Sequence, residues 1–225
     1  MLNRFTAKQY LLFDLDGTIS DPVEGITKSA VYALNELGYE VPDKATLASF
    51  IGPPLQETFG VYFGMDAKQV TKAVAKYREY YAPHGIYENQ LYPGIYELLE
   101  LLHSQNRRIV LATSKATPFA EQILKQHGID HFFTFVSGSE LSGERVNKRE
   151  VIEYAMANSG ATLADTVMIG DRKHDILAAN ALGLDSIAVL FGYGSREELT
   201  AAQPSALAAD VEELRCMLCG DRLAL

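Results

Sequence analysis

Short apolar runs alternate with helical patterns along most of this chain, and this alternation restricts its fold more than any other feature. Each run is rich in aliphatic or aromatic residues and is bounded by turn residues, which indicates a buried strand. The runs cover residues 10–13, 108–112, 132–136, 166–169 and 186–190. Strands that alternate with helices form a parallel sheet covered on both faces. We therefore expect an α/β fold with a Rossmann-like, doubly wound core.

Residues 22–92 interrupt the alternation. Turns that contain proline divide this segment into helical patterns, and we find no run in it that predicts a strand. The helical patterns cover residues 26–37, 55–63 and 67–81. We expect an all-helical domain at residues 22–92, inserted after the first strand of a core domain made of residues 1–21 and 93–225.

Polar residues end three of the predicted strands. Asp14 follows the first run, Thr113 and Ser114 follow the second, and Gly170-Asp171 follows the fourth. In open parallel sheets, ligands bind outside the carboxyl ends of the strands. The chemistry of this chain should therefore converge on one edge of one sheet.

The string Asp14-Leu15-Asp16-Gly17-Thr18 comes directly after the first apolar run. Two carboxylates at this spacing can take different roles if their surroundings separate their pKa values. An ionised carboxylate could attack phosphorus, and a protonated one could donate to the leaving oxygen. A cation would be needed too, because an anionic nucleophile is repelled by a phosphate. The alternative is a solvated turn, since Asp and Gly are ordinary turn residues.

Four motifs, in order, give the chain a resemblance to a known family. They are FDLDGT with Asp14, LATSK with Thr113, VNKREV with Lys148 and GDRKHD with Asp171. With these motifs the chain resembles the haloacid dehalogenase superfamily, in its phosphoglycolate-phosphatase-like branch, over about residues 10–190. The GDRKHDI string and the DPVEGI after DLDGT are similar to 5′-nucleotidase-like members. The resemblance implies that the helical insertion is a cap domain, which closes over the active site and excludes water.

The resemblance also implies roles for the motif residues. Asp14 would be the nucleophile and a metal ligand. Asp16 would be the general acid and base, and its backbone carbonyl would also touch the metal. Thr113 and Ser114 would bind the phosphate, and the ammonium group of Lys148 would stabilise its charge.

The metal implied by the resemblance is Mg²⁺. Asp171 would ligate it together with Asp14 and Asp16, and Asp175 would orient a bound water or Lys148. An oxygen-rich site with few protein ligands suits Mg²⁺, and the sequence has no His or Cys cluster that argues for zinc. The alternative is that Asp171 only caps a helix and Asp175 is a surface charge.

Two groups of residues in the helical insertion leave alternatives open. The loop at residues 50–55, which contains Gly52 and Pro53, could dip into the active site or be a plain turn between helices. A second group is rich in tyrosine and could stack on a base, but at helical spacing we expect it in the core and on the cap surface. Its members are Tyr77, Tyr80, Tyr81 and Tyr87.

Basic residues beside the motifs are also ambiguous. Lys115 is a rival of Lys148, although it stands within the second motif rather than in the lysine position. Arg172, Lys173 and His174 could add positive charge near the site or form the solvated start of a helix.

Charge and hydropathy limit the partners of the chain. The formal net charge is −9. This charge argues against a nucleic-acid partner, because binding to nucleic acid draws on clustered Lys and Arg. No run approaches the length of a membrane span, and residues 1–9 are too polar for a signal peptide. We expect a cytoplasmic protein, monomer or homodimer, whose partner is a small phosphorylated metabolite.

Cys216 and Cys219 form a CxxC pair with no second pair to complete a metal site.

The leading functional hypothesis is a magnesium-dependent phosphatase. A dehalogenase would need no general acid, so Asp16 argues against that activity. A phosphomutase would use the same core residues, and a non-catalytic binder on the same fold is a further alternative. Phosphoglycolate, a nucleoside 5′-monophosphate and small sugar phosphates all stay open as substrates.

Overall fold

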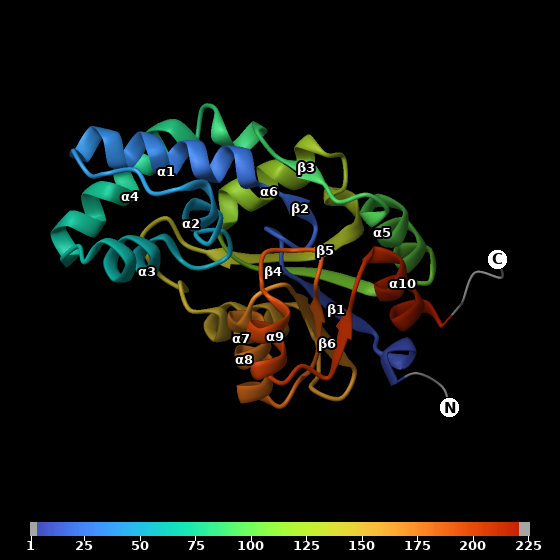
Figure 1. Ribbon diagram of the computed structural model, residues 1–225. Coiled ribbons are helices and arrows are strands. Elements are labelled where there is room, and N and C mark those ends of the chain that lie inside the picture. Colours follow the sequence, from blue (N-terminus) through green and yellow to red (C-terminus); the bar gives the residue numbers. More distant parts are fainter. Residues whose placement is uncertain (1–3, 221–225) are drawn as a thin grey trace.

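The computed structural model describes residues 4–220 and contains a six-stranded, all-parallel sheet (Figure 1). The order of its strands is β5-β4-β1-β6-β7-β8. The strands are β1 (Tyr10–Phe13), β4 (Arg108–Ala116), β5 (Phe133–Ser139), β6 (Thr166–Gly170), β7 (Asp185–Val189) and β8 (Ala206–Ala208). The outermost residues of the predicted core domain, 1–3 and 221–225, lie outside the described residues.

The strands β1, β4 and β6 occupy the centre of the sheet, with β1 between the other two. Tyr10 of β1 is level with Arg108 of β4 and Thr166 of β6. All five predicted strands are present. Strand β8 was not predicted, because its three residues are too few to form a pattern. Strand β4 continues beyond its apolar part to Ala116, with a shift of register after Ala112.

Helices cover both faces of the sheet, as the alternating side chains of β1 require. Leu11 and Phe13 pack on the face covered by α5 (Ile95–Ser104), α6 (Thr117–Gln126) and α10 (Val211–Cys219). Leu12 points to the other face, against α7 (Lys148–Ser159) and α8 (Lys173–Leu182), and α9 (Arg196–Ala201) packs beside α8. The expected doubly wound α/β core is confirmed. None of the helices in residues 4–220 is long and apolar enough to span a membrane.

The segment after β1 is mainly helical and gathers at the end of the molecule opposite α10 (Figure 1). The helices α1 and α4 are its longest, and Tyr32 of α1 contacts Tyr80 of α4. Its elements are α1 (Val23–Leu37), α2 (Lys44–Ala48), α3 (Leu55–Glu57), a π turn η2 (Thr58–Tyr62), α4 (Ala67–Tyr81) and the 3₁₀ turn η3 (Gly85–Tyr87). Outside this segment, two more 3₁₀ turns are η1 (Arg4–Ala7) and η4 (Asp130–Phe132).

The expectation that residues 22–92 contain no strand is wrong. Strand β3 (Gln90–Leu91) pairs antiparallel with β2 (Ser20–Asp21), with Ser20 opposite Leu91. The pair joins the two chain segments where the chain leaves the core for the helices and where it returns. Two residues are too few for a periodic pattern, so the sequence could not indicate this strand. The division into domains at residues 21 and 93 stays a prediction.

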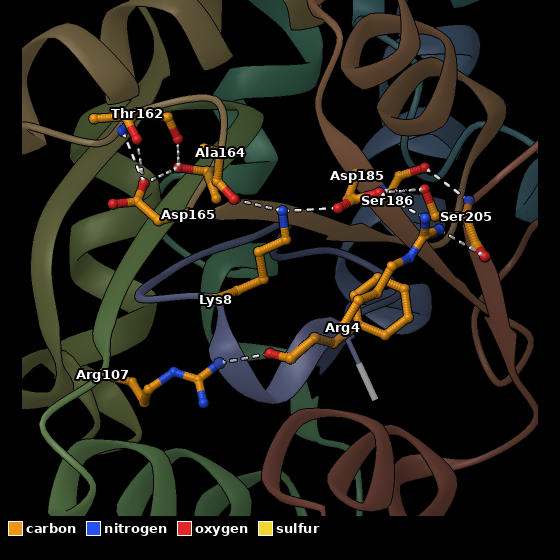
Figure 2. A network of polar contacts seen from close by, with 11 residues as sticks. Arg4, Lys8, Arg107, Thr162, Ala164, Asp165, Asp185, Ser186 and Ser205 are labelled. Carbon is orange, nitrogen blue, oxygen red and sulfur yellow. Dashed lines mark hydrogen bonds and ion pairs between the residues drawn. The ribbon is translucent and has the colours of Figure 1, made fainter. Parts of the chain in front are cut away.

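A polar network fixes the segment before β1 against the amino ends of the neighbouring strands (Figure 2). The ammonium group of Lys8 donates to the carbonyl of Ala164 at 2.8 Å and pairs with Asp185 at 2.7 Å. Arg4 pairs with the same carboxylate at 3.3 Å. The network holds the start of β1 in place and so sets the position of its carboxyl end.

Candidate active site

Three neighbouring strands bring the predicted site residues to one edge of the sheet. Asp14 follows β1, Thr113 lies in β4 and Asp171 follows β6, and all three side chains are buried. The backbone N–H of Asp14 donates to the carbonyl of Ile169 at 2.9 Å, so Asp14 is still held by the sheet. The three residues lie at the carboxyl edge of the sheet, as predicted, because neighbouring parallel strands end at the same edge.

Lys148 lies at the amino end of α7, directly after the capping residue Asn147. Its Nζ is 2.9 Å from Oδ1 of Asp14 and 2.7 Å from Oδ1 of Asp175. Burial alone would lower the pKa of Lys148, but the charges of Asp14 and Asp175 outweigh it and raise that pKa. Lys148 is therefore the cation beside Asp14, as its motif position predicts.

Asp14, Asp171 and Asp175 form a cluster of buried carboxylates whose oxygens lie within 4.8 Å of one another. Asp171 accepts hydrogen bonds from the N–H of Tyr193 at 2.8 Å and the hydroxyl of Thr18 at 3.4 Å. Burial, followed by the charges of Asp175 and Asp14, raises the pKa of Asp171 well above its usual value. A divalent cation among these oxygens would relieve the repulsion, and a set of oxygen donors fits Mg²⁺.

Two glycines leave the room that Asp171 occupies. A Cβ added to Gly17 would lie 2.1 Å from Oδ2 of Asp171, and the φ angle of Gly17 is +84°. A Cβ added to Gly192 would lie 2.4 Å from Cβ of Asp171. The glycine in DLDGT is therefore needed both for its backbone angle and for the approach of Asp171.

Asp16 has a lysine partner of its own. The Nζ of Lys115 is 2.8 Å from Oδ2 of Asp16 and donates to the hydroxyl of Tyr81 at 2.7 Å. The other oxygen of Asp16, Oδ1, is buried and has no hydrogen-bond partner among the described residues. Burial raises the pKa of Asp16, although the charge of Lys115 opposes this effect.

The contact between Lys115 and Asp16 was missed at the sequence level, where Lys115 counted only as a rival of Lys148. The sequence held one signal for it. Lys115 comes two residues after Thr113 at the end of a strand, and side chains at that spacing tend to share a face. No sequence signal placed Tyr81, which lies on α4 in the helical segment, against Lys115.

A cavity opens beside Asp16 between the core and the helical segment. Ser114 and Lys115 line it from the core, and Gly52 and Pro53 line it from the loop after α2. The loop at residues 50–55 thus lines the same cavity as Asp16, and its contact with a substrate stays a prediction. Aromatic rings make up much of the remaining wall: Phe50, Tyr77, Tyr81 and Phe119.

Tyr77 and Tyr81 of α4 are buried, Tyr80 is half-buried and Tyr87 is exposed, and the two buried tyrosines also face this cavity. The rings of Tyr77 and Tyr81 stack with centroids 5.4 Å apart and planes 19° apart. Burial raises the pKa of both hydroxyls well above the usual value, so neither is poised to lose its proton near neutrality. Their contribution to the cavity is an apolar, aromatic surface.

Comparisons with known proteins agree with this geometry. The model of a family described as haloacid dehalogenase-like hydrolase matches residues 11–189. The chain belongs to this family. The match spans the four motifs, so the resemblance found in the sequence is confirmed for the core.

Individual relatives of this haloacid dehalogenase-like hydrolase carry several names. This chain is 44% identical to a 5′-nucleotidase from Pseudomonas aeruginosa, over 92% of this chain and 94% of the relative. It is 36% identical to the tyrosine-protein kinase PtkA of Mycobacterium tuberculosis, over 92% of this chain and 71% of that protein. It is 29% identical to a phosphoglycolate phosphatase from Aliivibrio fischeri, over 92% of this chain and 95% of that enzyme.

A solved structure matches the whole arrangement of this hydrolase. The crystal structure of a predicted phosphatase from Clostridium acetobutylicum superposes with a TM-score of 0.92 at 40% identity. The match covers 95% of this chain and 99% of the other. The helical segment therefore shares in the likeness, because the match extends well beyond the core strands.

Proposed function

We propose that this chain is a magnesium-dependent phosphatase that hydrolyses a small phosphomonoester through an aspartyl phosphate on Asp14. The observation that carries the proposal is the separate pairing of two neighbouring carboxylates. Asp14 is paired with Lys148 at 2.9 Å, and Asp16 is paired with Lys115 at 2.8 Å. Two carboxylates in different surroundings can divide nucleophilic and proton-transfer work between them.

In the first step, a carboxylate oxygen of Asp14 forms a bond to phosphorus while the bond from phosphorus to the ester oxygen breaks. Asp16, protonated, gives its proton to the leaving oxygen, which departs as an alcohol. Burial supports the protonated form of Asp16 by raising its pKa. Lys148 and the hydroxyl of Thr113 would stabilise charge on the phosphoryl oxygens.

In the second step, the oxygen of a water molecule attacks phosphorus and the bond from phosphorus to Asp14 breaks. Asp16, now ionised, takes a proton from that water. Lys115 favours the ionised form of Asp16 through its charge. The enzyme returns to its starting state and releases inorganic phosphate.

The carboxylates of Asp14 and Asp171 and the backbone carbonyl of Asp16 would hold the Mg²⁺. When bound, Mg²⁺ would supply positive charge between the anionic nucleophile and the anionic ester. Asp175 lies in the same cluster but pairs with Lys148 and accepts from the N–H of Arg172 at 3.0 Å. We assign Asp175 the task of orienting Lys148.

A nucleoside 5′-monophosphate is the substrate class that the cavity favours. A planar base could pack on the aromatic wall that contains Phe50, Tyr77 and Tyr81, whereas the two-carbon acid of phosphoglycolate would leave that wall uncovered. The name of the Pseudomonas relative points to the same class. Phosphoglycolate is the second candidate, supported by the name of the Aliivibrio relative.

The test is release of inorganic phosphate from a panel of esters with Mg²⁺, run beside Asp14→Asn. The panel contains several nucleoside monophosphates, phosphoglycolate, sugar phosphates and a chromogenic aryl phosphate. We expect Mg²⁺-dependent release that is fastest with a nucleoside monophosphate and absent from Asp14→Asn. Isomerised phosphate esters without free phosphate would identify a phosphomutase instead, and halide release from a haloacid would identify a dehalogenase.

A further inference from the structure

The side chain of Arg172 reaches from the core to the loop that walls the cavity. Arg172 directly follows Asp171 and precedes α8, and it is only 9% exposed. Its Nη1 donates to the carbonyl of Ile51, with a second contact to the carbonyl of Ser49 at 3.4 Å. A buried guanidinium that donates to the backbone of the loop is not the solvated start of a helix.

Glu198 of α9 holds the other edge of the Arg172 guanidinium. Nε lies 3.0 Å from one carboxylate oxygen, and Nη2 lies 3.4 Å from the other. The same carboxylate accepts from the backbone N–H of Lys173 at 2.9 Å. Such a paired contact fixes the plane of the guanidinium, so its free edge points at the loop in one orientation.

The loop backbone rests directly on the stem of this arginine. A Cβ added to Gly52 would lie 2.6 Å from Cγ of Arg172, and the φ angle of Gly52 is +101°. Phe50, Gly52 and Pro53 line the cavity beside Asp16, whereas Arg172 itself does not. Arg172 thus supports the cavity wall from behind, without contact with the space that a substrate would fill.

We propose that Arg172, held by Glu198, is a positioning residue that fixes residues 49–53 as the wall facing the leaving group of the substrate. This proposal rests on the phosphatase function proposed above. Without Arg172, the carbonyls of Ser49 and Ile51 lose their link to the core, and the wall moves away from Asp16. The leaving group then binds less firmly, while the phosphoryl group keeps all its partners in the core.

The variants Arg172→Ala and Arg172→Lys test this role, with Lys173→Gln as the matched control. Lys173 is the next residue and is exposed, so the control removes one charge without touching the loop. We expect Arg172→Ala to raise KM for a nucleoside monophosphate about tenfold, the loss expected for a strong hydrogen bond. Inhibition by inorganic phosphate should change by less than about twofold, because phosphate makes no contact with the wall. The KM of Arg172→Lys should fall between those of the parent and Arg172→Ala, because an ammonium cannot hold Glu198 and two carbonyls in one plane.

Hydrogen–deuterium exchange of the same variants is a readout that does not depend on activity. Arg172→Ala should speed exchange in peptides covering residues 49–57 and leave those covering β1 and β6 unchanged. Glu198→Gln, which keeps the arginine, should speed exchange in the same peptides to a smaller extent. Lys173→Gln should match the parent protein.

Two results would overturn the proposal. In the first, Arg172→Ala has the KM and the exchange pattern of Lys173→Gln. In the second, exchange rises throughout the core and inhibition by phosphate weakens together with substrate binding, as a general loss of structure would produce. If the parent protein hydrolyses no ester, the phosphatase function fails, and exchange at residues 49–57 still decides whether Arg172 fixes the loop.

Discussion

The ammonium group of Lys115 lies 2.8 Å from the carboxylate of Asp16, the second aspartate of DLDGT. The first aspartate, Asp14, has Lys148 instead. Each carboxylate thus has its own cation, and the two lysines come from different parts of the chain. In the proposed mechanism, this division would let one carboxylate act as nucleophile while the other exchanges protons.

Loss of Lys115 should impair turnover without removing it. Lys115→Met leaves Asp16 buried without its charged partner, so we expect kcat for an alkyl phosphate to fall about 100-fold, within the range of general acid–base effects. Tyr81→Phe removes only the hydroxyl that Lys115 also contacts, and should cost far less. Steady-state phosphate release measures both. Equal losses in the two variants would show that the tether to α4, and not the charge beside Asp16, is what matters.

Gly17 should be intolerant of a methyl group for a reason that Gly38 does not share. Both residues have positive φ angles, but a Cβ on Gly38 would meet nothing within 4 Å, whereas one on Gly17 would strike Asp171. Gly38→Ala should cost about 1–2 kcal/mol of unfolding free energy for its backbone angle and keep full activity. Gly17→Ala should cost at least as much and lose most of its activity. Denaturant unfolding and phosphate release decide this, and an active Gly17→Ala would contradict the close approach of Asp171.

Asp171 should trade stability for metal binding. Without metal, Asp171→Asn removes one of three crowded carboxylates, so its Tm in a chelator should exceed that of the parent protein. Mg²⁺ at 100 times its Kd should stabilise the parent by about 2.7 kcal/mol, or several degrees in Tm, and Asp171→Asn hardly at all. Asp130 is exposed, so Asp130→Asn is the control and should keep the rise in Tm with Mg²⁺. A magnesium shift that survives in Asp171→Asn would exclude Asp171 as a ligand.

The network around Lys8 should make stability depend on pH (Figure 2). Burial alone would raise the pKa of Asp185, but the hydrogen bond and charge of Lys8 outweigh it and hold that pKa below its usual value. A carboxylate with a lowered pKa stabilises the fold above the pKa of the unfolded chain and loses this effect as the pH falls through the folded pKa.

Lys8→Met should therefore destabilise the protein by about 1 kcal/mol at pH 7. The difference from the parent should shrink as the pH falls below about 4, the pKa of an ordinary Asp, and should vanish only below the lowered pKa that Asp185 has in the folded parent. Urea unfolding across this range measures it. Arg149→Gln, which breaks an exposed pair with Glu153, should cost less than about 0.5 kcal/mol at either pH. A loss in Lys8→Met that stays constant from pH 7 to pH 3 would refute the ion pair as its cause.

The sequence predicted the core well because its signals were local. The first apolar run coincides with β1, and the motif residues follow strands whose carboxyl ends the parallel topology must bring together. Hydrophobic periodicity and strand ends were sufficient for this part. The two-residue strand β3 and the three-residue strand β8 were beyond such signals because they are shorter than any period.

The contacts between the helical segment and the core were not predictable in the same way. Tyr81 meets Lys115, and Arg172 meets Ile51, only because the helical segment packs against the core. Neither pair is close in sequence, and each residue alone has an ordinary structural explanation. Sequence patterns left Arg172 open between a charge near the site and a solvated surface group, and its partners appear only in three dimensions.

The phosphorylated form of Asp14 is the central claim, and Asp16→Asn is the variant in which to trap it. An aryl phosphate needs little help from an acid to leave, so the first step should proceed in this variant, while the second step lacks its base. We predict that an acid quench of Asp16→Asn with Mg²⁺ and the aryl phosphate yields a phosphorylated peptide by mass spectrometry, with the modification on Asp14. Phosphate release by the parent protein without any phosphorylated Asp14 in either protein would contradict the mechanism.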